Sequence, residues 1–282
     1  MINKNIVYIN SEIGCGAGVK GCEKAPAVLM ENIPTLKQKH IATISIDNSK
    51  DKLDAIDNIT SGCNELAKLV YENKNDSTFP IVIGGDHSTG FGTWSGASKD
   101  EDEYGLIWVD AHFDLHTSQT SDSKNIHGMV VASMIGIGDD RLTNIFYNGQ
   151  KIKPENIIFI GVRCFEKPEQ QMAEKYGIKV YYADEVAKVG FKSCFAQAVK
   201  SYQDRGINFG ISFDMDCLDT SEMTALGTPV KNGLILNDVI DTFNSVDMTG
   251  LNVLEVVEYN PDLDNDGKDI VPVKKVLSCF DS

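Results

Sequence analysis

The stretch Gly105-Leu106-Ile107-Trp108-Val109-Asp110-Ala111-His112-Phe113-Asp114 joins an apolar run to a cluster of charged residues. Its first five residues have the composition of a buried β-strand. Side chains two residues apart in an extended chain point to the same face. We therefore expect Asp110, His112 and Asp114 to project together from the end of this strand.

A second acidic cluster, Asp214-Met215-Asp216, follows the apolar run 207–213 in the same arrangement. Carboxylates gathered at one point repel one another, and they stay ionised together only when cations lie between them. We interpret the two clusters as the halves of a site for two metal ions.

Strand-like runs alternate with helix-compatible stretches, such as 53–71 and 184–202, almost to the end of the chain. This alternation predicts a mostly parallel sheet covered by helices. Because no linker or repeat divides the sequence, we expect a single domain over residues 1–282. Periodicity alone leaves open whether the sheet is open or closed into an eightfold barrel. The eight strand-like runs are 6–10, 41–46, 80–83, 105–109, 156–161, 178–182, 207–213 and 251–257.

The composition is that of a soluble globular protein, with 42% hydrophobic and 24% charged residues. The net charge of −15 argues against a nucleic-acid or anionic-membrane surface, which is basic. No apolar run is long enough to span a bilayer, and the first residues lack the apolar core of a signal peptide. Seven cysteines without CxxC spacing suggest reduced thiols. We expect a cytoplasmic protein with no nucleic-acid or membrane partner.

Two further polar segments follow strand-like runs, Gly84-Gly85-Asp86-His87-Ser88 and Glu255 to Pro261. In open parallel sheets, ligands bind beyond the carboxyl ends of the strands. A structural role is the default for any single histidine. Four of the five histidines, however, lie in or near the polar segments at these strand ends, which favours a functional role. These four are His87, His112, His116 and His127.

The ordered motifs resemble those of the ureohydrolase superfamily, which includes arginase, agmatinase and formiminoglutamase. The motifs are GGDHS at 84–88, DAHFD at 110–114, HG at 127–128, SFDMD at 212–216 and E-x-N-P at 258–261. The resemblance extends from GVKGCEKAPAVL at 18–29 to VLSCF at 276–280. It implies a three-layer α/β/α domain with a mostly parallel sheet of about eight strands. It also implies a homo-oligomer, either a trimer or a hexamer.

The same resemblance implies two Mn²⁺ ions per subunit, bridged by Asp110 and Asp214. Oxygen-rich ligation with imidazole and without thiolate fits Mn²⁺ better than a structural zinc site. It leaves Co²⁺, Ni²⁺ and Fe²⁺ open. The ligands implied are His87, Asp110, Asp114 and Asp214 for one ion, and His112, Asp110, Asp214 and Asp216 for the other.

The reaction that the resemblance implies is attack of a metal-bridging hydroxide on the carbon of a guanidino group. Asp114 would hold this hydroxide by a hydrogen bond, and His127 would shuttle a proton. Glu258 would pair with the substrate guanidinium, whereas Glu255 is expected to be structural.

Arginase is the member of the superfamily that the chain resembles most, which implies hydrolysis of L-arginine to L-ornithine and urea. Ser123 and Asn125 would then bind the α-carboxylate, Glu166 would face the α-ammonium, and Thr228 would lie near the guanidinium. His116 stands where arginases have an asparagine, and it can still donate to a carboxylate.

Other functions stay open at this stage. Lys124 replaces a glycine of the arginase pattern, and together with His116 it could serve the two carboxylates of formimidoylglutamate, the substrate that formiminoglutamase converts to glutamate and formamide. Agmatinase is a further alternative. Metal-dependent deacetylases share this kind of fold but use a single zinc. A metal-binding sensor or pseudoenzyme is the non-enzyme alternative, but all six ligand positions are intact.

Overall fold

Eight strands, drawn from the whole length of the chain, form one sheet in the order β2-β1-β3-β8-β7-β4-β5-β6. The computed structural model describes residues 4–281. Every neighbouring pair of strands is parallel. The strands are β1 Asn5–Glu12, β2 His40–Ser45, β3 Thr78–Ile83, β4 Gly105–Val109, β5 Ile157–Val162, β6 Lys179–Tyr182, β7 Phe209–Asp214 and β8 Leu251–Val257.

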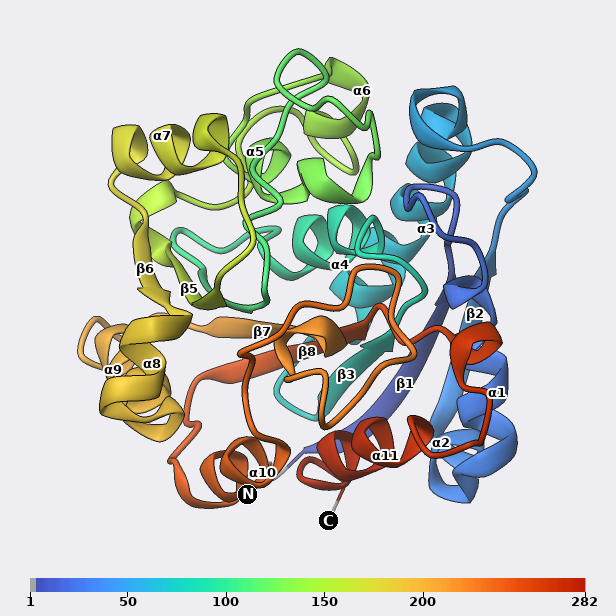
Figure 1. Ribbon diagram of the computed structural model, residues 1–282. Helices are drawn as coiled ribbons and strands as arrows, with labels where there is room; N and C mark the ends of the chain where they lie inside the picture. Colours follow the sequence, from blue (N-terminus) through green and yellow to red (C-terminus); the bar gives the residue numbers. More distant parts are fainter. Residues whose placement is uncertain (1–3, 282) are drawn as a thin grey trace.

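Helices cover both faces of this open sheet (Figure 1). Residues of α1, α2, α8, α9, α10 and α11 share one hydrophobic core, and residues of α3 to α7 share the other. The predicted α/β/α class is therefore confirmed, and the sheet is not a barrel. The helices are α1 Ala25–Asn32, α2 Pro34–Lys39, α3 Ile56–Asn73, α4 Thr89–Ala97, α5 Val130–Met134, α6 Asp140–Thr143, α7 Lys167–Tyr176, α8 Ala183–Val189, α9 Phe191–Gln203, α10 Leu236–Ser245 and α11 Ile270–Ser278.

The apolar strand runs are explained by burial on both faces. In β4, Ile107 packs into the core under α9 to α11, while Trp108 packs into the core under α3 to α7. Because successive side chains alternate between two buried faces, a central parallel strand needs hydrophobic residues at nearly every position. This is why the central strands could be predicted from composition, whereas β2 and β6 are partly exposed edge strands that were recognised by their β-branched residues.

The helix prediction for residues 184–202 is wrong in one respect. The stretch is two helices, α8 and α9, separated at Gly190. Gly190 has a φ of 89°, a left-handed backbone conformation that glycine adopts without steric cost. The change of direction there lets both helices pack on the sheet.

The four polar segments follow β3, β8, β7 and β4, which are the four central and mutually adjacent strands. Their carboxyl ends therefore open at one place on the sheet edge. At Gly85 the chain passes so close to β1 and its following loop that an added Cβ would lie 2.1 Å from the carbonyl oxygen of Ile13. Only glycine fits this approach, which fixes the loop that carries His87.

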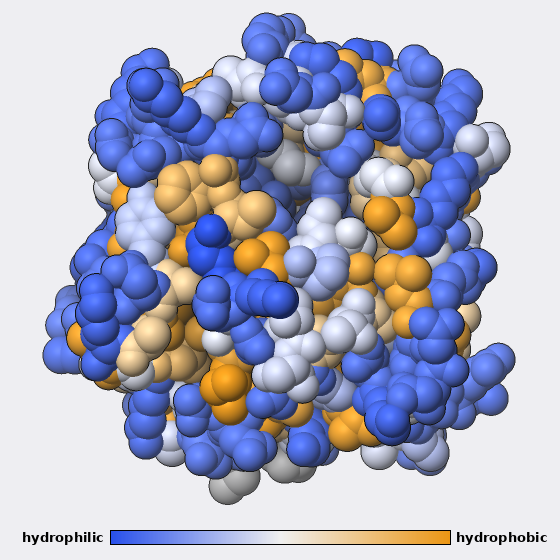
Figure 2. Space-filling view, viewed as in Figure 1, coloured by the Kyte–Doolittle hydropathy of each residue, from blue (hydrophilic) through white to orange (hydrophobic). Residues whose placement is uncertain are grey.

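Hydrophilic residues cover most of the molecular face seen in the space-filling view, and hydrophobic ones form separate patches (Figure 2). Within residues 4–281, no helix has the length and apolar character needed to cross a membrane.

Candidate metal centre

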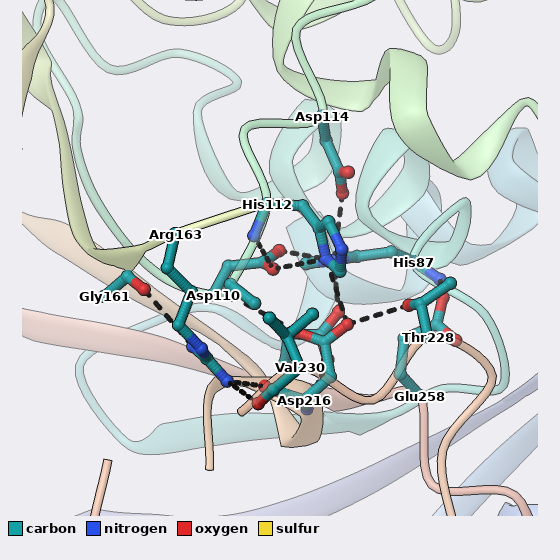
Figure 3. Close-up of polar contacts among 12 residues, drawn as sticks. His87, Asp110, His112, Asp114, Gly161, Arg163, Asp216, Thr228, Val230 and Glu258 are labelled. Carbon is teal, nitrogen blue, oxygen red and sulfur yellow. Dashed lines mark hydrogen bonds and ion pairs between the residues drawn. The ribbon is translucent and has the colours of Figure 1, made fainter. Parts of the chain in front are cut away.

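The DAHFD segment brings its charged side chains together through turns. β4 ends at Val109, and the chain leaves the sheet at Asp110. The carboxylate of Asp110 then accepts a hydrogen bond from the backbone N–H of His112 at 2.7 Å. Asp114 has a φ of 50°. Our expectation that strand alternation aligns these residues is therefore wrong in its reason, although the side chains do converge (Figure 3).

The second acidic cluster is held by a short helical turn and by an arginine. Asp214 is the last residue of β7, and its carboxylate accepts from the backbone N–H of Asp216 at 2.7 Å. The guanidinium of Arg163 donates to the backbone oxygens of Asp216 and Val230, both at 2.8 Å (Figure 3). Arg163 thus fixes the loop after β7, and its charged group does not face the candidate metal site.

Two groups of potential ligand atoms result, and Asp110 belongs to both. His87, Asp110 and Asp214 form the first group, and Asp110, His112 and Asp216 form the second, each with ligand atoms within 4.8 Å of one another. We name them the inner group and the outer group. His87 Nδ1 of the inner group lies 2.9 Å from a carboxylate oxygen of Asp214. His112 Nδ1 of the outer group lies 3.0 Å from a carboxylate oxygen of Asp216.

The electrostatics of the inner group fit a divalent cation. His87 Nδ1 is buried and, among the residues described, has no hydrogen-bond partner of acceptable geometry. It also lies 3.1 Å from a carboxylate oxygen of Asp114 and 3.2 Å from one of Asp110. One imidazole nitrogen and three carboxylates form a set of ligands suited to a cation. Their nitrogen and oxygen atoms converge on one point, and no hydrogen bond of good geometry joins the nitrogen to the carboxylates.

The pKa values of these carboxyl groups reflect the electrostatic repulsion between them. Burial and the charges of Asp216 and Asp110 raise the pKa of Asp214 well above its usual range. Burial and the charge of Asp110 raise the pKa of Asp114 to about 6. Burial also opposes ionisation of Asp110, but the close imidazoles of His112 and His87 outweigh it and lower the pKa of that carboxyl. A bound cation would relieve this repulsion.

His127 and Glu258 form an ion pair beside these groups. His127 Nδ1 lies 2.9 Å from Glu258 Oε1, which also accepts from the backbone N–H of His87 at 2.8 Å. Burial lowers the pKa of His127, but the charge of Glu258 and their hydrogen bond outweigh it and raise this pKa to about 9. Glu258 itself has a φ of 71°. The raised pKa favours the charged imidazolium form of His127 at neutral pH in the protein without metal.

A cavity of about 320 Å³ connects these residues with solvent. All the predicted catalytic and substrate-binding residues line it, whereas His87 and Asp110 are not part of its wall. Thr228 donates from its hydroxyl to a carboxylate oxygen of Asp216 at 3.0 Å. The lining residues are His112, Asp114, His116, Ser121, Ser123, Asn125, His127, Gly128, Cys164, Phe165, Glu166, Glu169, Asp214, Asp216, Thr228 and Glu258.

Several lining residues were missed at the mouth of the cavity, chief among them Glu169. Its carboxylate lies 3.3 Å from His116 Nε2 and accepts from the backbone N–H of Glu166 at 3.0 Å. The spacing of Glu166 and Glu169 is that of a capping box at the start of α7. This sequence pattern could have predicted that both residues lie at the start of a helix. Ser121, Cys164 and Phe165 carry no such signal.

Lys124, which could have served a substrate carboxylate, turns away from the cavity. Its ammonium group donates to the backbone oxygen of Ser118 at 2.8 Å. Its φ of 61° is a left-handed backbone conformation that favours glycine.

The Arginase family model matches residues 5–280. The chain belongs to this family. Membership makes the protein an arginase-family hydrolase and confirms the superfamily that the motifs indicated.

Individual relatives agree over nearly the whole length. The arginase of Bacillus subtilis (strain 168) is 32% identical over 279 residues, which cover 95% of this chain and 94% of the relative. The arginase of Brevibacillus brevis is 35% identical over 278 residues, covering 94% and 93%. The crystal structure of the arginase from Bacillus cereus superposes with a TM-score of 0.90 at 28% identity and covers 99% of each chain. This arginase-family chain therefore shares the complete fold.

Proposed function

We propose that this protein hydrolyses L-arginine to L-ornithine and urea, with two Mn²⁺ ions bound per subunit. The observation that carries the proposal is the charge of the cavity. Besides Asp114, Asp214 and Asp216, which would hold the metal ions, the carboxylates of Glu166, Glu169 and Glu258 line it, and within the described chain no lysine or arginine does. Such a cavity attracts a guanidinium and an α-ammonium group, the two cations of arginine.

The inner and outer groups would hold the two ions. We assign His87 and Asp114 to the inner ion, His112 and Asp216 to the outer ion, and Asp110 and Asp214 to both. Two divalent ions at such a site supply Lewis acidity that makes water a nucleophile near neutral pH. The unpartnered His87 Nδ1 and the raised pKa values of Asp114 and Asp214 support this assignment.

His127 would act on the leaving group. Its ion pair with Glu258 keeps a proton on the imidazole at neutral pH, at the wall of the cavity. An amine must leave protonated, and a positioned imidazolium can supply the proton. Asp114 would orient the attacking oxygen, and Glu258 would pair with the substrate guanidinium.

The mouth of the cavity would recognise the amino-acid end of the substrate. Glu166 and Glu169 supply acceptors for an α-ammonium, while Ser123, Asn125 and His116 supply donors for an α-carboxylate. The pKa of His116 is lowered by burial but raised overall by Glu169 and Glu166, which favours the charged imidazolium. The mouth therefore offers both signs of charge.

Formimidoylglutamate and agmatine fit less well. At the mouth, the two carboxylates of the first would face Glu166 and Glu169, and His116 is the one basic side chain there among the described residues, since Lys124 points elsewhere. Agmatine suits the acidic wall but leaves the donors of Ser123 and Asn125 without a partner. We extend the proposal to a cytoplasmic homo-oligomer, a trimer or a hexamer, on the strength of the sequence resemblance.

The test is a substrate comparison. Purified protein loaded with Mn²⁺ is incubated separately with arginine, agmatine, formimidoylglutamate and guanidinobutyrate, and urea or formamide is measured. We expect urea from arginine at the highest kcat/KM, loss of activity after chelation, and recovery with Mn²⁺. Full activity in metal-stripped protein would refute the metal mechanism, and preference for another substrate would refute the assignment to arginine.

A further inference from the structure

Glu255 is a buried acid that the proposed reaction does not use. It lies in the middle of β8, its side chain is not exposed to solvent, and it is three residues before Glu258. In the sheet it is the direct neighbour of Ser212 in β7, which in turn is the neighbour of Trp108 in β4. These three residues form one row across the central strands, directly beneath His87.

Glu255 and Ser212 connect this row to His87 by short hydrogen bonds. The hydroxyl of Ser212 donates to Glu255 Oε1 at 2.8 Å. The same hydroxyl lies 2.8 Å from His87 Nε2. Trp94 Nε1, from α4, donates to Glu255 Oε1 at 3.0 Å and holds the carboxylate in place. All four side chains are buried.

The direction of these bonds fixes the protonation of His87. A serine hydroxyl has a single hydrogen, and here that hydrogen is directed to Glu255. Ser212 can therefore only accept from the imidazole, so His87 Nε2 must carry a proton. With the proton of the neutral imidazole held on Nε2, a cation bound in the inner group would receive the lone pair of Nδ1.

We propose that Glu255 is a positioning residue that acts through Ser212 to fix the metal-binding tautomer of His87. The inference rests on the proposed metal site and adds to it. The ring of Trp108 stacks on His87 with centroids 4.1 Å apart and an angle of 5°, which restrains rotation of the imidazole. Stacking cannot choose between the two tautomers, whereas an acceptor at Glu255 Oε1 can.

Two substitutions separate this role from plain structural support. Glu255→Leu removes the acceptor and frees Ser212 to donate to His87 Nε2, which would place the imidazole proton on Nδ1. We expect the Kd of the inner ion to rise about 10–100-fold, with the outer ion affected less. Glu255→Gln keeps an acceptor oxygen, and Trp94 and Ser212 orient that oxygen because both donate to it. We expect this variant to bind the inner ion within about threefold of the parent, less than 1 kcal/mol.

Val253→Ala supplies the matched control. Val253 is buried in the same strand and has only apolar contacts to lose. This variant should lower Tm but leave both Mn²⁺ affinities unchanged. The measurement is calorimetric titration of each metal-free variant with Mn²⁺, and the inner ion is the one that His87→Ala abolishes.

A second measurement needs no variant and covers the case in which Glu255→Leu does not fold. Zn²⁺-loaded parent protein, labelled with ¹⁵N-histidine, reports the tautomer of His87 by long-range proton–nitrogen correlation. We expect a proton on Nε2 and none on Nδ1. An Nε2 without a proton, or parent-like inner-ion affinity in Glu255→Leu, would overturn the inference. Failure of the parent to bind any divalent ion would instead overturn the proposed metal site.

Discussion

The metal end of the cavity and its mouth are built in different ways. At the metal end, His87 is buried and is supported by β4, β7 and β8 through Trp108, Ser212 and Glu255. At the mouth, Ser123 and Glu166 lie on loops or at the start of a helix, and both are exposed. The difference teaches that the sheet supports His87 at the metal end, whereas the contacts proposed for the substrate depend on the conformation of loops.

Removal of the shared ligand is the change with the largest expected effect. Asp110 belongs to both the inner and the outer group. Asp110→Asn should therefore lose both ions and reduce urea formation to background, which metal analysis and a urea assay would check. Asp241→Asn, an equal change of charge at an exposed position in α10, is the control and should be neutral. Two retained ions in Asp110→Asn would contradict the shared role.

Loss of His127 should slow the reaction while leaving the metal end intact. His127 contacts Glu258 and belongs to neither ligand group. His127→Ala should lower kcat by about 10²–10⁴-fold, the usual contribution of a positioned acid. Metal analysis should still find two ions per chain. A variant that instead loses an ion would make His127 a ligand and would move it into the metal end.

A change at the mouth should affect only substrates with a carboxylate. His116→Ala removes the one basic side chain that the mouth offers among the described residues. We expect KM for arginine to rise about tenfold, the loss of one hydrogen bond to a charged group, with little change in kcat. Agmatine has no carboxylate, so its KM should stay the same or fall. An equal rise for both substrates would mean that His116 supports the loop only.

The smallest expected effect is a pH dependence of stability in protein without metal. The folded pKa of His127, about 9, lies above its ordinary value, so the ion pair with Glu258 stabilises the folded state fully below about pH 6.5. This stabilisation is lost as the pH rises through about 9. Between pH 7 and 9.5, Tm in a chelator should fall by several degrees more in the parent than in His127→Asn. Parallel curves for the two proteins would rule out the ion pair as the cause.

The contrast between the two regions also explains which features of the fold and of the site could be predicted from the sequence. The central strands were found because burial on both faces leaves a continuous apolar run, as in residues 105–109. The edge strands β2 and β6 are partly exposed and were found from their β-branched residues. The acidic and histidine clusters could be singled out because charged side chains directly follow such runs, and the family resemblance then indicated which of them would be ligands. The adjacency of β3, β8, β7 and β4 could not be read from periodicity, because the sheet order reflects chain crossovers and not local composition.

At the mouth the sequence was less informative, for physical reasons. Glu169 is brought to His116 by the first turn of α7, a contact between segments about fifty residues apart. Lys124 carries a charge that suggested a carboxylate site, but its left-handed backbone sends the side chain to Ser118. The directions of such side chains depend on the backbone dihedral angles of the loops. Glu255 was expected to be structural, and only the row that it shares with Ser212 indicates more.

Asp114 and Glu258 share one further property, since both have a positive φ. For residues other than glycine this conformation costs roughly 1–2 kcal/mol, and aspartate and asparagine adopt it more readily than glutamate does. Glycine at Asp114 would relieve this backbone strain but remove a carboxylate from the cavity wall, and glycine at Glu258 would also break the ion pair with His127. The local backbone strain at these two positions is therefore accepted in exchange for two carboxylates that face the same cavity.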